Sequence, residues 1–121
     1  MSEVSVLGGK TVLLCAADGP LIDSERHAND LIGDAWGVEA SVIAVPVSRL
    51  APAFFDLRSG LAGAIAQKIV NYRLQLAVIG DISVHLAASR ALTDWVREAN
   101  QRGDIWFLAD TDGLARRLGA A

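Results

Sequence analysis

The stretch "GLAGAIAQKIVNYRLQLAVIGD", residues 60–81, joins an amphipathic pattern directly to a short apolar run. Leu61, Ile65, Ile69 and Tyr72 recur at helical spacing, which predicts a helix with one buried face, and Ala62, Ala66 and Val70 widen that face. The run "LQLAVIGD" that follows is mostly apolar and closes at Asp81, as in strands that are covered on both faces. A helix that leads at once into such a strand predicts a parallel sheet with helices packed on it.

The same alternation continues on both sides of this stretch. "SVIAVPV" at residues 41–47 and "IWFLAD" at residues 105–110 predict two more buried strands. Helical stripes precede each of them, the first capped by Asp23 or Ser24 and ended by Gly37. "TDGLARRLG" predicts a short terminal helix with Asp110 or Thr111 as its cap, whereas "ISVHLA", residues 82–87, is expected to be a loop.

The N-terminal segment "EVSVLGGKTVLLCAADGP" contains two strand-like runs around Gly8-Gly9. Glycine pairs tolerate the positive φ angles of tight hairpin turns, so a β-hairpin is predicted. Its first strand would then be an antiparallel edge of the sheet. Together these patterns predict one α/β domain over residues 1–121, with a hairpin-edged, mostly parallel sheet and helices packed on it.

Charge and composition exclude several classes of partner. The formal charge of −3 arises from 11 Lys and Arg against 14 Asp and Glu. The basic residues are scattered, so we expect no nucleic-acid partner. The apolar runs are far shorter than the ~18 residues of a membrane span, so no membrane association is expected. The N-terminus lacks the features of a secretory signal, and we expect a cytoplasmic protein.

The sequence contains no recognisable metal or cofactor motif. Cys15 is the only cysteine and has no partner for a disulfide or a cysteine-rich metal site. His27 and His85 are far apart, without the spacing of a zinc site. "GLAG" lacks the lysine of a P-loop, and no G-x-G-x-x-G opens a helix. We therefore predict no metal and no cofactor.

Polar residues follow each predicted parallel strand at its carboxyl end, where open parallel sheets tend to bind ligands. Asp18, Ser48, Asp81 and Ser83 are the candidates for such a ligand edge. Two carboxylates and a hydroxyl can hold Mg²⁺, or serve as base and nucleophile. The alternative is that they are turn and helix-cap residues, which Asp and Ser commonly are at such places.

Ser59 stands where the second long helix is predicted to begin. As its N-cap, Ser59 would accept hydrogen bonds from free amides of the first turn. A phosphate on Ser59 would lie at the positive end of the helix dipole and change the surface charge, which suits a binding switch. We interpret Gly60 and Gly63 as positions of tight helix–sheet packing. A partner surface around this helix start would comprise Phe54, Phe55, Asp56, Arg58, Gly60 and Leu61.

The blocks "GPLI", "FFDLRSGLAGAIAQKIVNYRLQLAVIGDIS" and "SRALTDWVREANQRGDIWF" closely resemble a small bacterial family, domain of unknown function 4180. This resemblance spans nearly the whole chain and implies no activity. "FFDLRSGLAG" is also similar, more distantly, to the STAS domain of anti-sigma-factor antagonists. There a D-S-S-G-L-type motif opens the same helix, and a partner kinase phosphorylates the serine before the glycine. Asp56 and Ser59-Gly60-Leu61 would match that motif, although one residue is inserted and Arg58 replaces the other serine.

Three hypotheses about function follow. The leading one is a non-enzymatic regulatory module that binds a protein or a small ligand, with Ser59 as its switch. The second is a small enzyme, or a nucleotide- or Mg²⁺-binding protein, that uses the carboxyl edge of the sheet. The third is a homodimer formed through the edge strand at residues 3–7, because an unpaired edge favours association.

Overall fold

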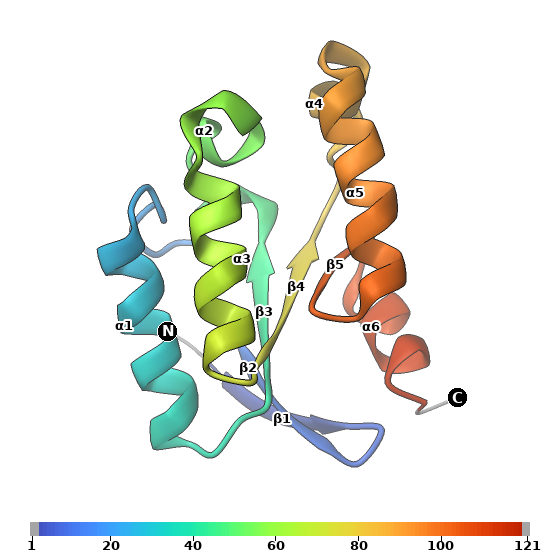
Figure 1. Cartoon of the computed structure of the whole chain (residues 1–121). Helices are drawn as coiled ribbons and strands as arrows, with labels where there is room; N and C mark the ends of the chain where they lie inside the picture. The colour runs from blue at the N-terminus through green and yellow to red at the C-terminus, as the bar shows by residue number, and fades with distance from the viewer. Residues whose placement is uncertain (1–2, 120–121) are drawn as a thin grey trace.

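The computed structural model describes residues 3–119, which form a five-stranded sheet with helices on both faces (Figure 1). The strands lie in the sheet in the same order as in the chain. The first strand pairs antiparallel with the second, and all later pairs are parallel. The predicted α/β class and the hairpin edge are thereby confirmed. The strands are β1 (Glu3–Leu7), β2 (Lys10–Leu14), β3 (Val42–Pro46), β4 (Gln75–Ile79) and β5 (Ile105–Leu108).

Side-chain caps begin α1 (Glu25–Gly37) and α6 (Thr111–Arg117). The Ser24 hydroxyl accepts a hydrogen bond from the His27 amide (3.4 Å), and Asp110 accepts one from Gly113 (2.8 Å). Both caps confirm predictions from the sequence. The helices are α1 (Glu25–Gly37), α2 (Pro52–Phe55), α3 (Leu61–Asn71), α4 (Ser83–Ala88), α5 (Arg90–Arg102) and α6 (Thr111–Arg117), with 3₁₀ turns η1 (Val47–Arg49) and η2 (Leu57–Ser59).

The monotonic strand order decides which helices cover which face. Right-handed crossovers that always step the same way place every crossover helix on one side. Accordingly α1, α3 and α5 lie together over one face, while α6 packs behind β5 (Figure 1). Alternate strand residues such as Ile43 and Val78 join the larger core, and Val42 and Ala77 join the smaller one under Leu114 of α6. Burial on both faces explains the continuous apolar runs of the strands.

The hairpin turn follows the expectation for Gly8-Gly9. Both glycines have positive φ, 58° and 79°, which a two-residue hairpin of the I′ type requires. Gly8 also packs against the end of α6, where a side chain at this position would overlap the backbone of Leu118. The hairpin tip is thus positioned by the C-terminal helix as well as by its own turn.

Two local predictions are wrong. Residues 83–88 are helical rather than a loop, because Asp81 accepts a hydrogen bond from the Ser83 amide at the start of α4. Phe54 and Phe55 form the short helix α2 and are buried, 0% and 7% exposed. They pack into the larger core and so do not contribute to a partner surface. A period of 3.6 residues is not detectable in helices this short.

None of the helices within residues 3–119 combines the length and the apolar character needed to cross a membrane.

Candidate functional site

The carboxyl ends of β2, β3 and β4 lie side by side, as parallel pairing requires. Ser48 follows β3, and its hydroxyl donates to the carbonyl of Ala17, the residue before Asp18 (3.4 Å). Gly80 follows β4 and lies against Val47, whose Cγ2 would be 2.9 Å from an added Cβ. The structure therefore brings the segments that carry Asp18, Ser48 and Asp81 to one edge of the sheet.

The Asp81 side chain at this edge bonds its local backbone. Asp81 Oδ1 accepts the Ser83 amide at 2.8 Å, so Asp81 and Ser83 together start α4. This backbone hydrogen bond, with a second one from the Ser83 side chain, lowers the pKa of Asp81 below its ordinary value of 3.8. The lowered pKa keeps Asp81 ionised, and the carboxylate is the form that accepts these hydrogen bonds at the start of α4. This shift is the opposite of the raised pKa of a carboxyl that acts as a general acid.

The strand order lacks the feature that usually forms a ligand crevice at this edge. Ligand crevices in open parallel sheets form at a switch point, where consecutive crossovers run to opposite faces. Here β2 to β5 follow in chain order, and their crossover helices share one face. Within residues 3–119 no three His, Cys, Asp or Glu side chains gather closely enough to hold a metal ion. Asp18 and Asp81 thus belong to no such cluster.

Arg49 is the residue at this edge that sequence reasoning missed. It is a buried cation, 9% exposed, at the end of η1. Its Nε donates to the Pro20 carbonyl (2.7 Å) and its Nη1 to the Ala16 carbonyl (2.8 Å). Arg49 thereby joins the loop after β2 to the turn after β3. An arginine after a strand is usually a surface residue. Arg49 is buried because Gly19, distant in the sequence, leaves room for the guanidinium.

Ser59 lies one residue earlier than an N-cap. Gly60 is the N-cap of α3, with φ of 78°, so the predicted cap at Ser59 is displaced by one position. The Ser59 hydroxyl still accepts the Leu61 amide (3.2 Å), and it donates to the Ala53 carbonyl at 2.6 Å. Ser59 therefore connects α2 to the start of α3. Its side chain is exposed, and its modification stays a prediction.

The remaining residues of the expected partner surface divide by exposure. Asp56 and Arg58 are exposed, and Asp56 Oδ1 accepts the Arg58 amide at 3.1 Å at the start of η2. Leu61 is half-buried against the larger core. The accessible part of this surface is therefore mainly a polar turn, and its role in binding a partner stays a prediction.

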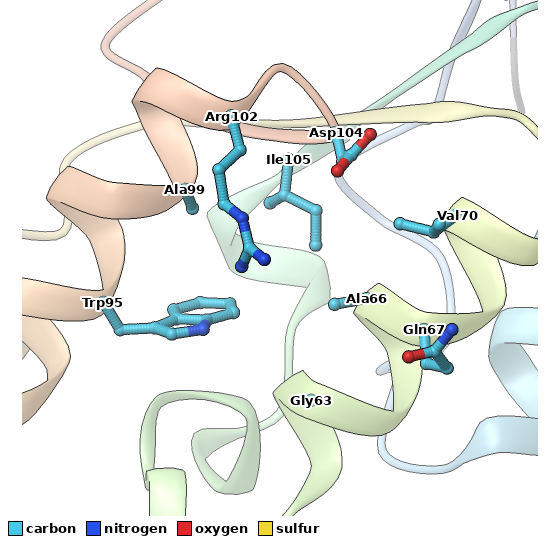
Figure 2. Close-up of a pocket in the computed structure, with 9 residues that line it drawn as sticks. All are labelled: Gly63, Ala66, Gln67, Val70, Trp95, Ala99, Arg102, Asp104 and Ile105. Carbon is cyan, nitrogen blue, oxygen red and sulfur yellow. The ribbon is translucent and has the colours of Figure 1, made fainter.

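Gly60 and Gly63 do not serve tight packing, so this interpretation is wrong. A Cβ at either position would have no atom within 4 Å, other than its own helix and chain neighbours. Gly60 is required by its positive φ, but Gly63 lies inside α3, where its φ gives no such reason. Gly63 instead faces a groove between α3 and α5 (Figure 2).

This groove has a volume of about 340 Å³ and opens beside the start of β5. Small residues on both helices leave the space free, since Gly63 and Ala66 lie on α3 and Ala99 lies opposite on α5. In Figure 2 the Trp95 indole and the Arg102 guanidinium both extend from α5 into the groove. The full lining comprises Gly63, Ala66, Gln67, Val70, Trp95, Ala99, Arg102, Asp104 and Ile105.

The two large side chains of the groove differ in how they are held. Trp95 makes edge contacts with Phe107 (5.7 Å between centroids) and Phe54 (6.5 Å), which orient its ring. Arg102 is exposed, and no ion pair recorded among residues 3–119 includes it. A fixed aromatic ring and a free guanidinium therefore border the same space.

The groove was not predicted, although its signal is present in the sequence. Gly63, Ala66, Gln67 and Val70 have helical spacing along the margin of the core face of α3. Val70 and Ala66 were assigned to the core, but Val70 is 44% exposed. Trp95 and Ala99 of α5 pack in or against the larger core and also line the groove. Small residues facing one another across two helices indicate close packing or a groove, and only the structure distinguishes these.

Comparison with known proteins identifies the family but not an activity. The sequence matches the family model described as Domain of unknown function (DUF4180) over residues 7–118. The chain belongs to this family. The predicted membership is thus confirmed, and the match includes all nine groove residues. No curated protein and no solved structure matches the sequence.

Proposed function

We propose that this DUF4180 chain is a non-enzymatic binding module. Its α3–α5 groove would receive a small molecule that carries an anionic group beside a flat apolar part. The observation that carries the proposal is that Trp95 and Arg102 both point into one groove of about 340 Å³. This volume is within the range of about 300–1,000 Å³ that small-molecule sites occupy.

The chemistry of the lining favours such a ligand. A guanidinium binds a carboxylate or phosphate through two parallel hydrogen bonds. An indole offers a broad face on which a planar group can stack. Ala66, Ala99 and Ile105 add apolar contact, and the missing side chain of Gly63 allows the ligand to approach the backbone of α3.

Binding is favoured over catalysis because of what the groove contains. Among its nine described lining residues, Asp104 is the one carboxylate, and none is Ser, Thr, Cys, His or Lys. Nucleophilic and acid–base mechanisms use a pair of such groups within hydrogen-bond reach of one another. A regulatory role would follow from the position of the groove, because a ligand would bridge α3 and α5.

The experiment is an NMR screen of aromatic carboxylates and aryl phosphates against neutral and cationic aromatics of the same size. The Trp95 indole N–H resonance, assigned from Trp95→Phe, reports occupancy. Anionic aromatics should shift it saturably. Arg102→Gln should weaken their binding about tenfold or more, since charge-assisted hydrogen bonds contribute about 1.5–3 kcal/mol.

Two further variants separate the groove from general surface charge. Gly63→Leu should block binding by filling the space, because nothing lies within 4 Å of that Cβ position. Arg97→Gln, on the same helix but outside the groove, should leave binding unchanged. The proposal is wrong if anionic fragments bind no better than neutral ones, or if Gly63→Leu binds them as the wild type does.

A further inference from the structure

The two edges of the sheet differ in whether another element covers their outward backbone groups. At the β5 edge, Leu76 N–H donates to the Asp104 carbonyl and Gly80 N–H to the Leu108 carbonyl. Along a strand the backbone N–H and C=O groups of successive residues point to opposite neighbouring strands. Because the carbonyls of Asp104 and Leu108 point to β4, the N–H and C=O groups of Phe107 point away from it. That outward amide donates to Asn100 Oδ1 of α5 at 2.7 Å. A side chain from α5 thus occupies the β5 edge.

The β1 edge has no such cover within the described residues 3–119, where β1 pairs with β2 alone. In a two-residue hairpin the residues that flank the turn exchange both hydrogen bonds, here Leu7 and Lys10. Hydrogen-bonded and non-hydrogen-bonded pairs alternate along the two strands. The backbone N–H and C=O groups of Ser5 therefore also point towards β2. The N–H and C=O groups of Val4 and Val6 point outward.

The side chains of this edge are apolar as well. Val4 and Val6 are 51% and 67% exposed, and both lie on the α1 face, opposite Leu13 and Thr11. The segment "EVSVL" has no proline and no lysine, the residues that commonly protect sheet edges from pairing. Its one charged residue, Glu3, lies at its start.

We propose that β1 is a self-association edge, and that two copies of this chain pair antiparallel about Ser5. In this register Val4 of one copy lies opposite Val6 of the other, and the same holds for the symmetry-related pair. Each outward valine then exchanges both hydrogen bonds with its partner, which gives four bonds across the two-fold axis. No other symmetric register of residues 3–7 pairs all the outward groups.

The same register also matches the side chains. The four valines form two cross-strand apolar pairs on one face, and such β-branched pairs stabilise sheets. On the other face Ser5 lies opposite its own copy, and Glu3 lies opposite Leu7, so no like charges are apposed. Five residues per strand form a small interface, so the dimer belongs to the weak, concentration-dependent class. This proposal is independent of the groove between α3 and α5.

The first measurement is sedimentation velocity on the full chain over a wide range of concentration. Wild type should shift from monomer to dimer as concentration rises. Val4→Lys/Val6→Lys places lysines directly opposite one another and should remain monomeric, whereas Val4→Lys/Val6→Glu places Lys opposite Glu and should restore the dimer. Both sites are exposed, so circular dichroism at low concentration should show that each variant is folded.

The second measurement tests the register by disulfide formation. In Ser5→Cys the two introduced thiols are directly opposed, within the reach of a disulfide. In Glu3→Cys they are separated by four residues along the strands, about 13 Å. Ser5→Cys should cross-link at least tenfold faster than Glu3→Cys, and wild type, with only buried Cys15, serves as the blank.

The inference is overturned if wild type stays monomeric at all concentrations, or if a dimer persists in Val4→Lys/Val6→Lys. Equal cross-linking of Ser5→Cys and Glu3→Cys would exclude the register. Open-ended oligomers in place of a dimer would exclude the two-fold arrangement.

Discussion

The guanidinium of Arg49 lies directly against Gly19: a Cβ built on that glycine would be 2.5 Å from Arg49 Cζ. The φ angle of Gly19 lies outside the left-handed region, so space rather than backbone conformation excludes a side chain there. Arg49 cannot easily yield, because two backbone carbonyls of the same loop accept its hydrogen bonds. The residue pair thus fixes the course of the chain between β2 and α1.

Gly19→Ala should therefore destabilise the protein by about 1–3 kcal/mol, the usual penalty for overpacking a well-filled site. Arg49→Ala should lower the free energy of unfolding by about 2–3 kcal/mol, through loss of charge-assisted hydrogen bonds. The double variant should be destabilised by less than the sum, because removal of Arg49 frees the space. Urea unfolding of the four proteins measures this coupling, and additive effects would contradict the contact.

The contrast between Arg49 and the strands shows what the sequence can predict. Apolar runs at 41–47 and 74–81 report burial on both faces, so they predict the parallel sheet without knowledge of any partner. Caps such as Ser24 and Asp110 bond an amide within one helical turn, so they too can be predicted from the local sequence. Arg49 is buried by carbonyls about thirty residues earlier in the chain, and that relation leaves no local pattern.

The candidate site was harder to predict for the same reason. The carboxyl-edge residues were identified correctly as following the strands, but their hydrogen bonds assign Asp81 and Ser83 to a helix start. The groove depends on the distance between α3 and α5. These helices are separated in the chain by β4 and α4, so no local pattern reports that distance. Gly63 is typical of a packing residue in the sequence, and only the structure shows that it faces open space.

Gly63→Ala should increase stability by about 0.5–1 kcal/mol, the usual gain of alanine over glycine inside a helix. The added methyl group has no atom within 4 Å to meet, so no clash offsets the gain. Gly80→Ala is the matched opposite: it has φ of 137° and would place a Cβ 2.9 Å from Val47 Cγ2. Thermal unfolding should show a higher Tm for the first variant and a lower one for the second.

The contribution of Asp81 to folding stability should change with pH in one direction. Hydrogen bonds from the Ser83 amide and side chain favour the carboxylate, so folding lowers the pKa of Asp81 from 3.8. The folded state then binds fewer protons, and this stabilisation is complete above the ordinary pKa. It is lost as the pH falls through the lowered folded pKa.

An NMR titration of the Asp81 carboxyl carbon measures this pKa directly. Ser83→Ala removes the side-chain hydrogen bond but keeps the amide, so the pKa should rise only part of the way towards 3.8. Ser83→Pro, which also removes the amide donor, should raise it further. An Asp81 pKa at its ordinary value in wild type would contradict the role assigned to Asp81 in starting α4.

Ser59→Ala should destabilise the start of α3 by about 1 kcal/mol, because the hydroxyl both accepts the Leu61 amide and donates to Ala53. Ser59→Asp keeps an acceptor for Leu61 but has no donor for Ala53. It should therefore recover only part of the loss, and a phosphate would do likewise. Chemical denaturation of the three proteins measures the order. An aspartate as stable as serine would show that the Ala53 hydrogen bond contributes nothing.

The two sheet edges lead to a last prediction, on Asn100. The Asn100 Oδ1 accepts a hydrogen bond from the outward amide of Phe107 in β5. Arg117 of α6 donates a hydrogen bond to the backbone carbonyl of Asn100. Asn100→Ala removes the first contact and exposes an edge amide, which should lower stability by about 1–2 kcal/mol. Asn100→Asp retains an acceptor and should stay close to wild type, while Asn71→Ala, which removes an exposed contact to Gln67, is a surface control. Hydrogen exchange at Phe107 should accelerate in Asn100→Ala alone, because only there does the amide lose its partner. Protection at Phe107 that survives Asn100→Ala would mean that the β5 edge is closed by something other than this side chain.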